Sequence, residues 1–439
     1  MKKLTTIQIL VVGLLNATAY AASPVPAIPD DNAPTQFCAV PPKGHIILWG
    51  ADAAKSGSPM TYQISYLADE AVAGKPMQIS VHTTTPVEME KVNAKTGLKE
   101  KIKTQNHGWK IISITLKKQS VESITLPPMD KETSVELFFT EENKENVARP
   151  RPLSNSIELK KKGNLFQLPE ADEIAKTIAA LPEKSPAPPA SPRKVLVYTA
   201  TAGFKHDSIP LGARTILLLG QKTGAWQTHI SNDCFMFEPE TLAQFDAVMM
   251  METTGPLFGV ADRATNERLR KSLLDFVQSG KGLAGSHAAT DCAYDWKEYG
   301  DMIGAYFNGH PFGKITVRNE DPKSPINAAF KGEGFDFQDE MYTFKDPYSR
   351  EKLRILLSID IAKMADDPAK PGFKMKENRA DHDYAISWIK EYGKGHVFYC
   401  SFGHQHNIWW TPTLLEHYLA GMQYALGDLK ADAKPSASK

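Results

Sequence analysis

A run of small residues at the end of a short apolar strand is the feature that most constrains the fold of this sequence. Residues 282–286 are typical of a buried strand, and Gly285-Ser286-His287-Ala288-Ala289 follows the pattern of a nucleophile elbow. Small residues on both sides of the central position allow a tight strand-to-helix turn without Cβ clashes. The pattern predicts an α/β fold with an imidazole, that of His287, at the reactive position of the turn.

Length and charge narrow the classes of partner. With 439 residues the chain exceeds what one core usually supports, so we expect two folded domains. Lys plus Arg and Asp plus Glu both number 51, which gives a formal net charge of zero. This balance argues against nucleic acid as a partner.

The N-terminus has the three regions of a secretory signal peptide. Lys2 and Lys3 precede an apolar run at residues 7–15, and Ala19-Tyr20-Ala21 provides the small residues of a cleavage site. We expect residues 1–21 to be removed and the protein to be periplasmic or secreted. The apolar run is too short to span a bilayer, and no later segment approaches the roughly 20 apolar residues of a membrane-spanning helix.

Four cysteines would then lie in an oxidising compartment. They are Cys38, Cys234, Cys292 and Cys400. Their spacing lacks zinc-finger regularity, and three complete pairings are open to them. One disulfide or none both remain open, and so does the oligomeric state.

Residues 40–150 predict a small all-β, sandwich-like domain. The strand-like runs, rich in alternating or β-branched residues, are 45–49, 61–67, 77–83, 109–116 and 134–140. We find no cluster of acid, base and nucleophile candidates in this region. An accessory role in packing or binding is therefore expected for it.

A helix and a proline-rich linker are predicted at residues 151–192, and an α/β domain at 193–428. The helix falls at 170–180, and the prolines of residues 182–192 favour an extended linker. In the α/β domain the expected strands are 194–199, 226–230, 245–251, 282–286, 314–317, 353–359, 384–388 and 396–401, and the expected helices are 209–222, 261–279 and 412–426. The early alternation of strands and helices predicts a largely parallel sheet covered on both faces. Residues 429–439 are expected to form a disordered tail.

Four motifs follow one another along the second domain. They are residues 194–209 with His206, residues 282–291 with His287, Asp339-Glu340-Met341-Tyr342, and residues 392–404 ending at His404. Together they resemble the ThuA-like (trehalose-utilisation) family, over roughly residues 193–428. The resemblance implies a flavodoxin-like parallel-sheet core similar to that of class I glutamine amidotransferases, whose elbow residue is normally cysteine. Because an imidazole cannot replace the thiolate of the acyl intermediate, His287 argues against amidotransferase chemistry.

The four motifs supply the candidate catalytic residues His206, His287, Glu340 and His404. The three histidines follow expected strands, where ligands of parallel sheets bind, and Asp339-Glu340 could close a further strand with one carboxylate pointing inward. If they converge at one rim of the sheet, they suit either acid–base catalysis or a divalent metal, and both uses need the same residues. Each residue also has a structural alternative, which is a solvated loop histidine, a buried hydrogen-bonded histidine or an ordinary acidic turn.

Five further residues are candidates for substrate binding, namely Asp291, Trp296, His310, His382 and Trp409. Asp291 is expected to open the helix after the elbow, either as its N-cap or in its first turn. The two histidines fall in expected loops. The two tryptophans could stack on sugar rings.

The family resemblance implies an exported enzyme that processes a small-molecule saccharide. We expect a hydrolase or lyase acting on disaccharides or on glycosides oxidised at C3. A ketone at C3 acidifies the C2 proton, so a base could remove it while a cation or imidazolium holds the developing oxyanion and an acid protonates the departing glycosidic oxygen. The alternative is a non-catalytic carbohydrate-binding or scaffold protein whose tryptophans and histidines only bind the sugar.

Overall fold

The computed structural model describes most of the chain. The described residues are 46–49, 60–93, 97–126, 134–141, 166–167, 169, 171–260, 262–310, 312–364 and 379–436. The expected signal peptide and Cys38 lie outside these residues. Within them, no helix combines the length and the apolar character needed to cross a membrane, and Cys234, Cys292 and Cys400 are buried free thiols.

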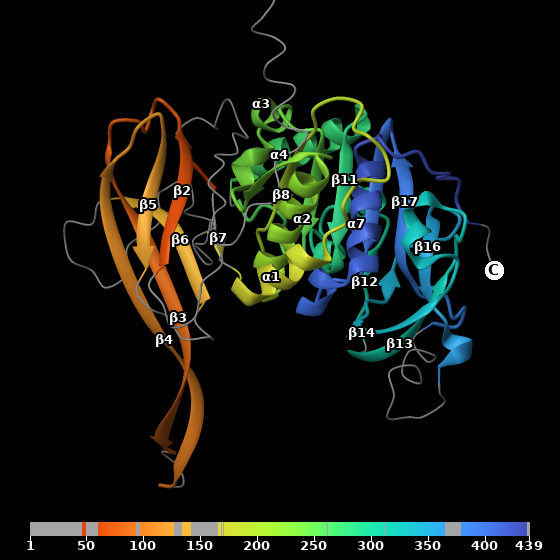
Figure 1. Cartoon of the computed structure of the whole chain (residues 1–439), viewed down its shortest axis with the longest axis horizontal. Coiled ribbons are helices and arrows are strands. Elements are labelled where there is room, and N and C mark those ends of the chain that lie inside the picture. Colours follow the sequence, from red (N-terminus) through yellow and green to blue (C-terminus); the bar gives the residue numbers. More distant parts are fainter. Residues whose placement is uncertain are drawn as a thin grey trace, which may run out of the picture.

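Two antiparallel sheets precede the α/β part of the chain (Figure 1). Their strands are β1 (Ile46–Trp49), β2 (Met60–Ala68), β3 (Pro76–Val92), β4 (Lys99–Thr115), β5 (Gln119–Leu126), β6 (Ser134–Glu141) and β7 (Phe166–Gln167). One sheet has the order β1-β2-β5 and the other the order β4-β3-β6-β7. The all-β character of this region agrees with the expectation, whereas a sandwich packing of the two sheets stays a prediction.

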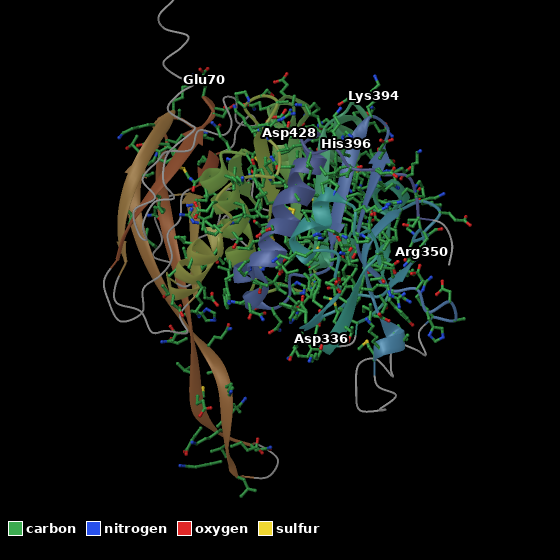
Figure 2. The ribbon with its side chains drawn as sticks, turned by 45° about the vertical axis from the view of Figure 1, so that its right-hand side comes forward. Glu70, Asp336, Arg350, Lys394, His396 and Asp428 are labelled. Carbon is green, nitrogen blue, oxygen red and sulfur yellow. The ribbon has the colours of Figure 1, made fainter. Side chains whose placement is uncertain are left out.

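Strands β3 and β4 are about twice as long as the sequence suggested. They pair with each other from end to end, while β6 pairs with β3 only as far as Thr84. Beyond that point they form a two-stranded arm that projects from the rest of the molecule (Figure 2). The apolar side chains Met89 and Val92 are exposed in the arm, and its strands are joined by cross-strand pairs such as Glu90 opposite Lys101.

The α/β part is built on one nine-stranded sheet. Its strands, in spatial order, are β14 (Phe335–Glu340), β13 (Phe312–Asn319), β16 (Arg354–Ile359), β17 (Ala385–Tyr392), β18 (Gly395–Cys400), β11 (Gly282–Ser286), β10 (Ala247–Met251), β8 (Lys194–Tyr198) and β9 (Gln227–Ser231). A small separate pair is formed by β12 (Tyr306–Phe307) and β15 (Phe344–Lys345). The helices are α1 (Ala171–Ala180), α2 (Ile209–Thr223), α3 (Pro239–Leu242), α4 (Arg263–Gln278), α5 (Lys297–Ile303) and α7 (Pro412–Ala425).

The sheet is mixed, which corrects the expectation of a largely parallel sheet. Strands β9, β8, β10, β11 and β18 are parallel to their neighbours in this group. Numbered along the chain, they stand in the order 2-1-3-4-5, which is the flavodoxin-like order. Strands β14, β13, β16 and β17 extend the sheet in antiparallel fashion, because they are joined without crossover helices.

Both faces of the central sheet are buried, as the continuous apolar strands predict. In β8, Val195 and Val197 belong to one hydrophobic cluster, whereas Leu196 and Tyr198 belong to another. Residues of α2 and α7 pack in the first cluster, and residues of α4 and α5 pack in the second. The helices therefore cover opposite faces, and the carboxyl ends of the parallel strands remain available for a site.

The proline-rich stretch and the described start of the C-terminal tail both make polar contacts with the α/β part. The proline-rich stretch lies against the end of α7, because the amide of Gln423 exchanges two hydrogen bonds with the backbone of Ala187. Asp428 accepts a hydrogen bond from the Ala190 backbone and forms an ion pair with Arg193 at 2.6 Å. In the tail, Ser436 bonds to the backbone at the start of β16. Proline content alone missed these polar contacts.

A buried histidine gives the core a testable pH dependence. One ring nitrogen of His417 lies 2.9 Å from the Ser387 hydroxyl and the other 3.1 Å from the carbonyl of Ile326. Burial lowers the pKa of His417 to about 4, whereas an unfolded histidine titrates near 6.5. Between these values the unfolded state takes up a proton that the folded state does not, so stability falls as the pH falls.

We predict that His417→Gln destabilises the protein most at neutral pH and that its deficit shrinks toward pH 5. Glutamine loses part of the hydrogen bonding, but it removes the acid-sensitive group. Urea unfolding of both proteins at pH 7.5, 6 and 5 measures the difference in unfolding free energy. A difference that stays constant over this range would contradict a buried neutral imidazole.

Candidate functional site

The candidate residues lie at the carboxyl edge of the sheet. His206 follows β8, His287 follows β11 directly, and His404 follows β18. The parallel strands β8, β10, β11 and β18 are successive neighbours, so their carboxyl ends share one edge. Glu340 comes from elsewhere, since it is the last residue of β14 in the antiparallel extension.

These side chains meet in a cluster that we call the histidine–glutamate cluster. Its members are His206, His287, Glu340 and His404, and one ligand atom from each lies within 4.8 Å of the others. Glu340 Oε2 is 3.3 Å from both His287 Nε2 and His404 Nδ1. The His206 ring is 4.8 Å from the His287 ring and 5.2 Å from the His404 ring, centroid to centroid. The structure therefore brings together all four residues that the motifs supplied.

The backbone of His287 is constrained so that one ring nitrogen faces the cluster. Its φ of 40° lies in the left-handed region, which non-glycine residues rarely adopt. Its Nδ1 is 2.9 Å from the carbonyl of Ser401. The backbone carbonyl of His287 accepts a hydrogen bond from the Tyr399 hydroxyl at 2.6 Å. A proton on Nδ1 bonded to that carbonyl leaves the lone pair of Nε2 directed at Glu340.

The elbow continues into a 3-10 turn, η4 (His287–Thr290), rather than into an α-helix. Asp291 therefore ends this turn instead of opening a helix, contrary to the expectation. Its carboxylate accepts a hydrogen bond from the Tyr294 hydroxyl, and burial raises the pKa of Asp291 above its usual value.

Burial and the neighbouring side chains set the charge states of the cluster. Burial, with the neighbouring histidines, lowers the pKa of His206 to about 3, so this imidazole is neutral. Burial opposes ionisation of Glu340, but its contacts with His287 and His404 outweigh burial and lower the pKa of Glu340 below its usual value. The same carboxylate raises the pKa of His404.

The unpartnered nitrogens provide a test of whether a metal fits. Among the described residues, His206 Nδ1, His287 Nε2 and His404 Nδ1 are buried and lack a hydrogen-bond partner, since the 3.3 Å contacts to Glu340 do not have hydrogen-bond geometry. Buried polar atoms without partners are rare and costly in folded proteins. Three such nitrogens converging on an ionised carboxylate fit the coordination of a divalent cation.

His310 joins the cluster at its solvent side. Its Nδ1 lies 3.0 Å from Glu340 Oε1, the oxygen that the other histidines leave free, and its side chain is 40% exposed. Its ring stacks on Phe307. Of the five expected substrate-binding residues, His310 is the one that contacts the cluster directly.

Three of the expected substrate-binding residues lie away from solvent or away from the cluster. Trp296 is buried, stacks on Tyr299 and lies under the guanidinium of Arg270, so it is a core residue. Trp409 is also buried, and its indole N–H donates to the carbonyl of Gly403. Neither can stack on a sugar in this structure. His382 lies on an exposed turn, and none of the contacts recorded for the described residues joins it to the cluster.

A search of protein families identifies the domain. The model of the ThuA family, described as trehalose utilisation, matches residues 194–425. The chain belongs to the ThuA family. The resemblance inferred from the four motifs is thereby confirmed.

Two solved structures of ThuA-like proteins are similar to this chain at low sequence identity. One from Bacteroides uniformis is 19% identical, covers 54% of this chain and 92% of its own, and has a TM-score of 0.42. Another, from Parabacteroides merdae, is 15% identical, covers 56% of this chain and 95% of its own, and has a TM-score of 0.39. No curated protein matches the chain.

Two buried acids of the ThuA domain were missed by sequence reasoning as site residues. Asp339 accepts hydrogen bonds from the backbone of Gly403 and Gln405, both at 3.0 Å, and so holds the loop that carries His404. Glu252, directly after β10, accepts a hydrogen bond from the Ser208 hydroxyl at 2.8 Å. Ser208 stands at the N-cap position of α2, but its hydroxyl bonds to Glu252 and makes no cap hydrogen bond. The sequence signal that could have identified them is an acidic residue at the end of a strand, Glu252 after β10 and Asp339 near the end of β14.

We predict that Asp339→Asn destabilises the domain by about 1–3 kcal/mol, because a buried amide NH₂ must then face a backbone N–H. Asp336→Asn is the matched control on the same strand, since Asp336 is exposed at the edge of the domain (Figure 2). The control should stay within about 0.5 kcal/mol of the parent protein. Urea unfolding measures both, and equal effects would contradict the role of Asp339 in holding the loop.

Proposed function

We propose that this protein is a carbohydrate-processing enzyme whose histidine–glutamate cluster holds a divalent cation. Its substrates would be disaccharides or glycosides, including glycosides oxidised at C3, and its reaction a hydrolysis or an elimination. The observation that carries the proposal is the convergence of four ligand atoms within 4.8 Å. Among the described residues, each of the three histidines also has a buried ring nitrogen without a hydrogen-bond partner. The trehalose-utilisation description of the family supports the carbohydrate class.

Three imidazoles and one carboxylate suit zinc and other first-row divalent cations. A bound cation would supply Lewis-acid stabilisation of negative charge on a sugar oxygen. The protein contributes the shape of the site. His287 is fixed by Ser401 through its second nitrogen, and Asp339 fixes the loop of His404, which are the outer contacts that orient metal ligands in proteins.

His310 is the residue best placed to move a proton. If the four cluster residues serve as ligands, His310 is an imidazole beside them that is not itself a ligand, and its side chain is 40% exposed. A C3 ketone makes the C2 proton acidic, so His310 could accept that proton. The C2–H electron pair then forms the C1=C2 bond as the C1–O bond breaks, and the His310 imidazolium returns its proton to the departing oxygen. Glu340 would orient the His310 ring through its Oε1 atom. Positioned acid–base groups typically contribute about 10²–10⁴-fold to rate.

A non-catalytic carbohydrate-binding role is less well supported. It rested on Trp296, Trp409 and Trp410 as sugar-stacking rings. The first two are buried, and the half-buried ring of Trp410 is covered by the ammonium of Lys176. Export to the periplasm or medium remains part of the proposal and rests on residues 1–21 alone.

Sugar release tests the proposed function. We predict that the purified protein releases sugar from a 3-keto-glucoside faster than from the unoxidised parent, and that a chelator abolishes the release until zinc or manganese is restored. His404→Ala should lower turnover at least about 100-fold. The control is His396→Ala, because His396 lies near the other end of β18 (Figure 2).

The outcome of this experiment is decisive for the cluster. Turnover that survives both chelation and loss of His404 would contradict a metal-dependent reaction at this site. No turnover of either sugar by the metal-replete protein would contradict the enzymatic proposal as a whole.

A further inference from the structure

Exposed aromatic side chains gather beside the histidine–glutamate cluster. Among the described residues, the exposed large apolar side chains are Met89, Val92, Leu98, Ile111, Phe204, Tyr294 and Phe312. The first four lie in the N-terminal β region, and the last three lie in the ThuA domain. Single exposed apolar residues are ordinary, but exposed aromatic rings grouped at one site are typical of binding surfaces.

Hydrogen bonds between its backbone and Thr254 hold the loop that carries Phe204. Thr254 accepts a hydrogen bond from the Gly203 backbone through its carbonyl at 3.2 Å, and its hydroxyl donates to the Phe204 carbonyl at 2.7 Å. The Phe204 ring lies 4.8 Å from the ring of His206, yet the residue is 65% exposed. The loop thus presents an aromatic ring to solvent next to a cluster member.

Phe312 reaches the cluster from the antiparallel extension. It is the first residue of β13 and stands directly opposite Glu340 on β14. Directly opposite residues of an antiparallel pair project from the same face of the sheet. The Phe312 ring is accordingly 6.3 Å from the ring of His404, and the residue is 48% exposed.

The accessible side of the cluster is the side that Phe312 borders. His206 and His287 are buried, whereas the side chains of His404 and Glu340 are 24% and 12% exposed. A ligand that reaches the cluster from solvent must therefore approach past His404 and Glu340. Tyr294, the third exposed aromatic, is engaged with Asp291 and the ammonium of Lys345.

We propose that the rings of Phe204 and Phe312 form the sugar-binding surface of this site. The C–H face of a pyranose ring would pack on an aromatic ring, while the hydroxyl or ketone oxygens at the sugar's edge point to the cluster and to His310. Aromatic side chains with a few convergent polar groups are the usual lining of small-molecule sites. The ligand class rests on the proposed function, whereas the placement of the rings rests on the contacts above.

Binding measurements on ring variants test this inference. The full chain is treated with chelator so that turnover cannot interfere, and it is titrated with methyl α-D-glucopyranoside and with its 3-keto derivative by NMR. Phe204→Ala and Phe312→Ala should each weaken binding about 3- to 10-fold, the effect of removing one aromatic contact. Phe204→Tyr, which keeps the ring, should bind within about twofold of the parent protein.

Two controls separate sugar binding from structural damage. Ile111→Ala removes an apolar side chain in the β region that is about as exposed as Phe312, and it should leave binding unchanged. The metal content of each variant before chelation should equal that of the parent, because neither phenylalanine is a ligand. Loss of metal together with loss of sugar affinity would overturn the inference and assign the rings to shaping the cluster.

The inference and the proposed function can fail separately. Sugar binding that depends on the two rings, without turnover by the metal-replete protein, would support the aromatic sugar-binding surface and contradict the enzymatic function. If both alanine variants keep the sugar affinity of the parent protein and still turn over the sugar, the aromatic sugar-binding surface is contradicted and the enzymatic proposal is not. If the parent protein binds neither sugar, the proposed aromatic sugar-binding surface is contradicted.

Discussion

The carboxylate of Glu340 is the interaction on which the site depends. It lies 3.3 Å from His287 and from His404 through one oxygen and 3.0 Å from His310 through the other. Burial of an ionised carboxylate is costly unless positive or polar groups compensate it. Imidazole nitrogens compensate it here, two from the ends of parallel strands and one from the loop before β13. Because Glu340 itself ends β14, it links the parallel half of the sheet to the antiparallel extension.

Support for this arrangement comes from groups that never enter the cluster. Asp339, next to Glu340, points the other way and receives two backbone N–H groups of the 403–405 loop. Gly403 leaves no room for a side chain, since a Cβ there would lie 2.8 Å from the Cβ of His287. The indole of Trp409 then bonds to the Gly403 carbonyl. A short loop is thus fixed from three directions, which sets the position of His404.

Sequence reasoning reached the parallel half of the fold and the four cluster residues for local reasons. Apolar strands followed by Gly-Ser-His or Gly-His turns place side chains at strand ends, and parallel order brings those ends together. The antiparallel extension was only partly predicted, because β14 alternates with charged residues and reads as a turn. The tryptophans were misjudged for a related reason. Composition identifies an aromatic residue, but only packing decides whether its ring faces solvent or the core.

The central claim is that the four converging side chains bind one divalent cation. Anomalous X-ray scattering at the zinc edge, from crystals of the full chain grown with zinc, tests it most directly. We predict a single anomalous peak about 2.0–2.2 Å from nitrogens of His206, His287 and His404 and from an oxygen of Glu340. A zinc-containing crystal with no peak at the cluster, and with these side chains in contact as described, would contradict the claim.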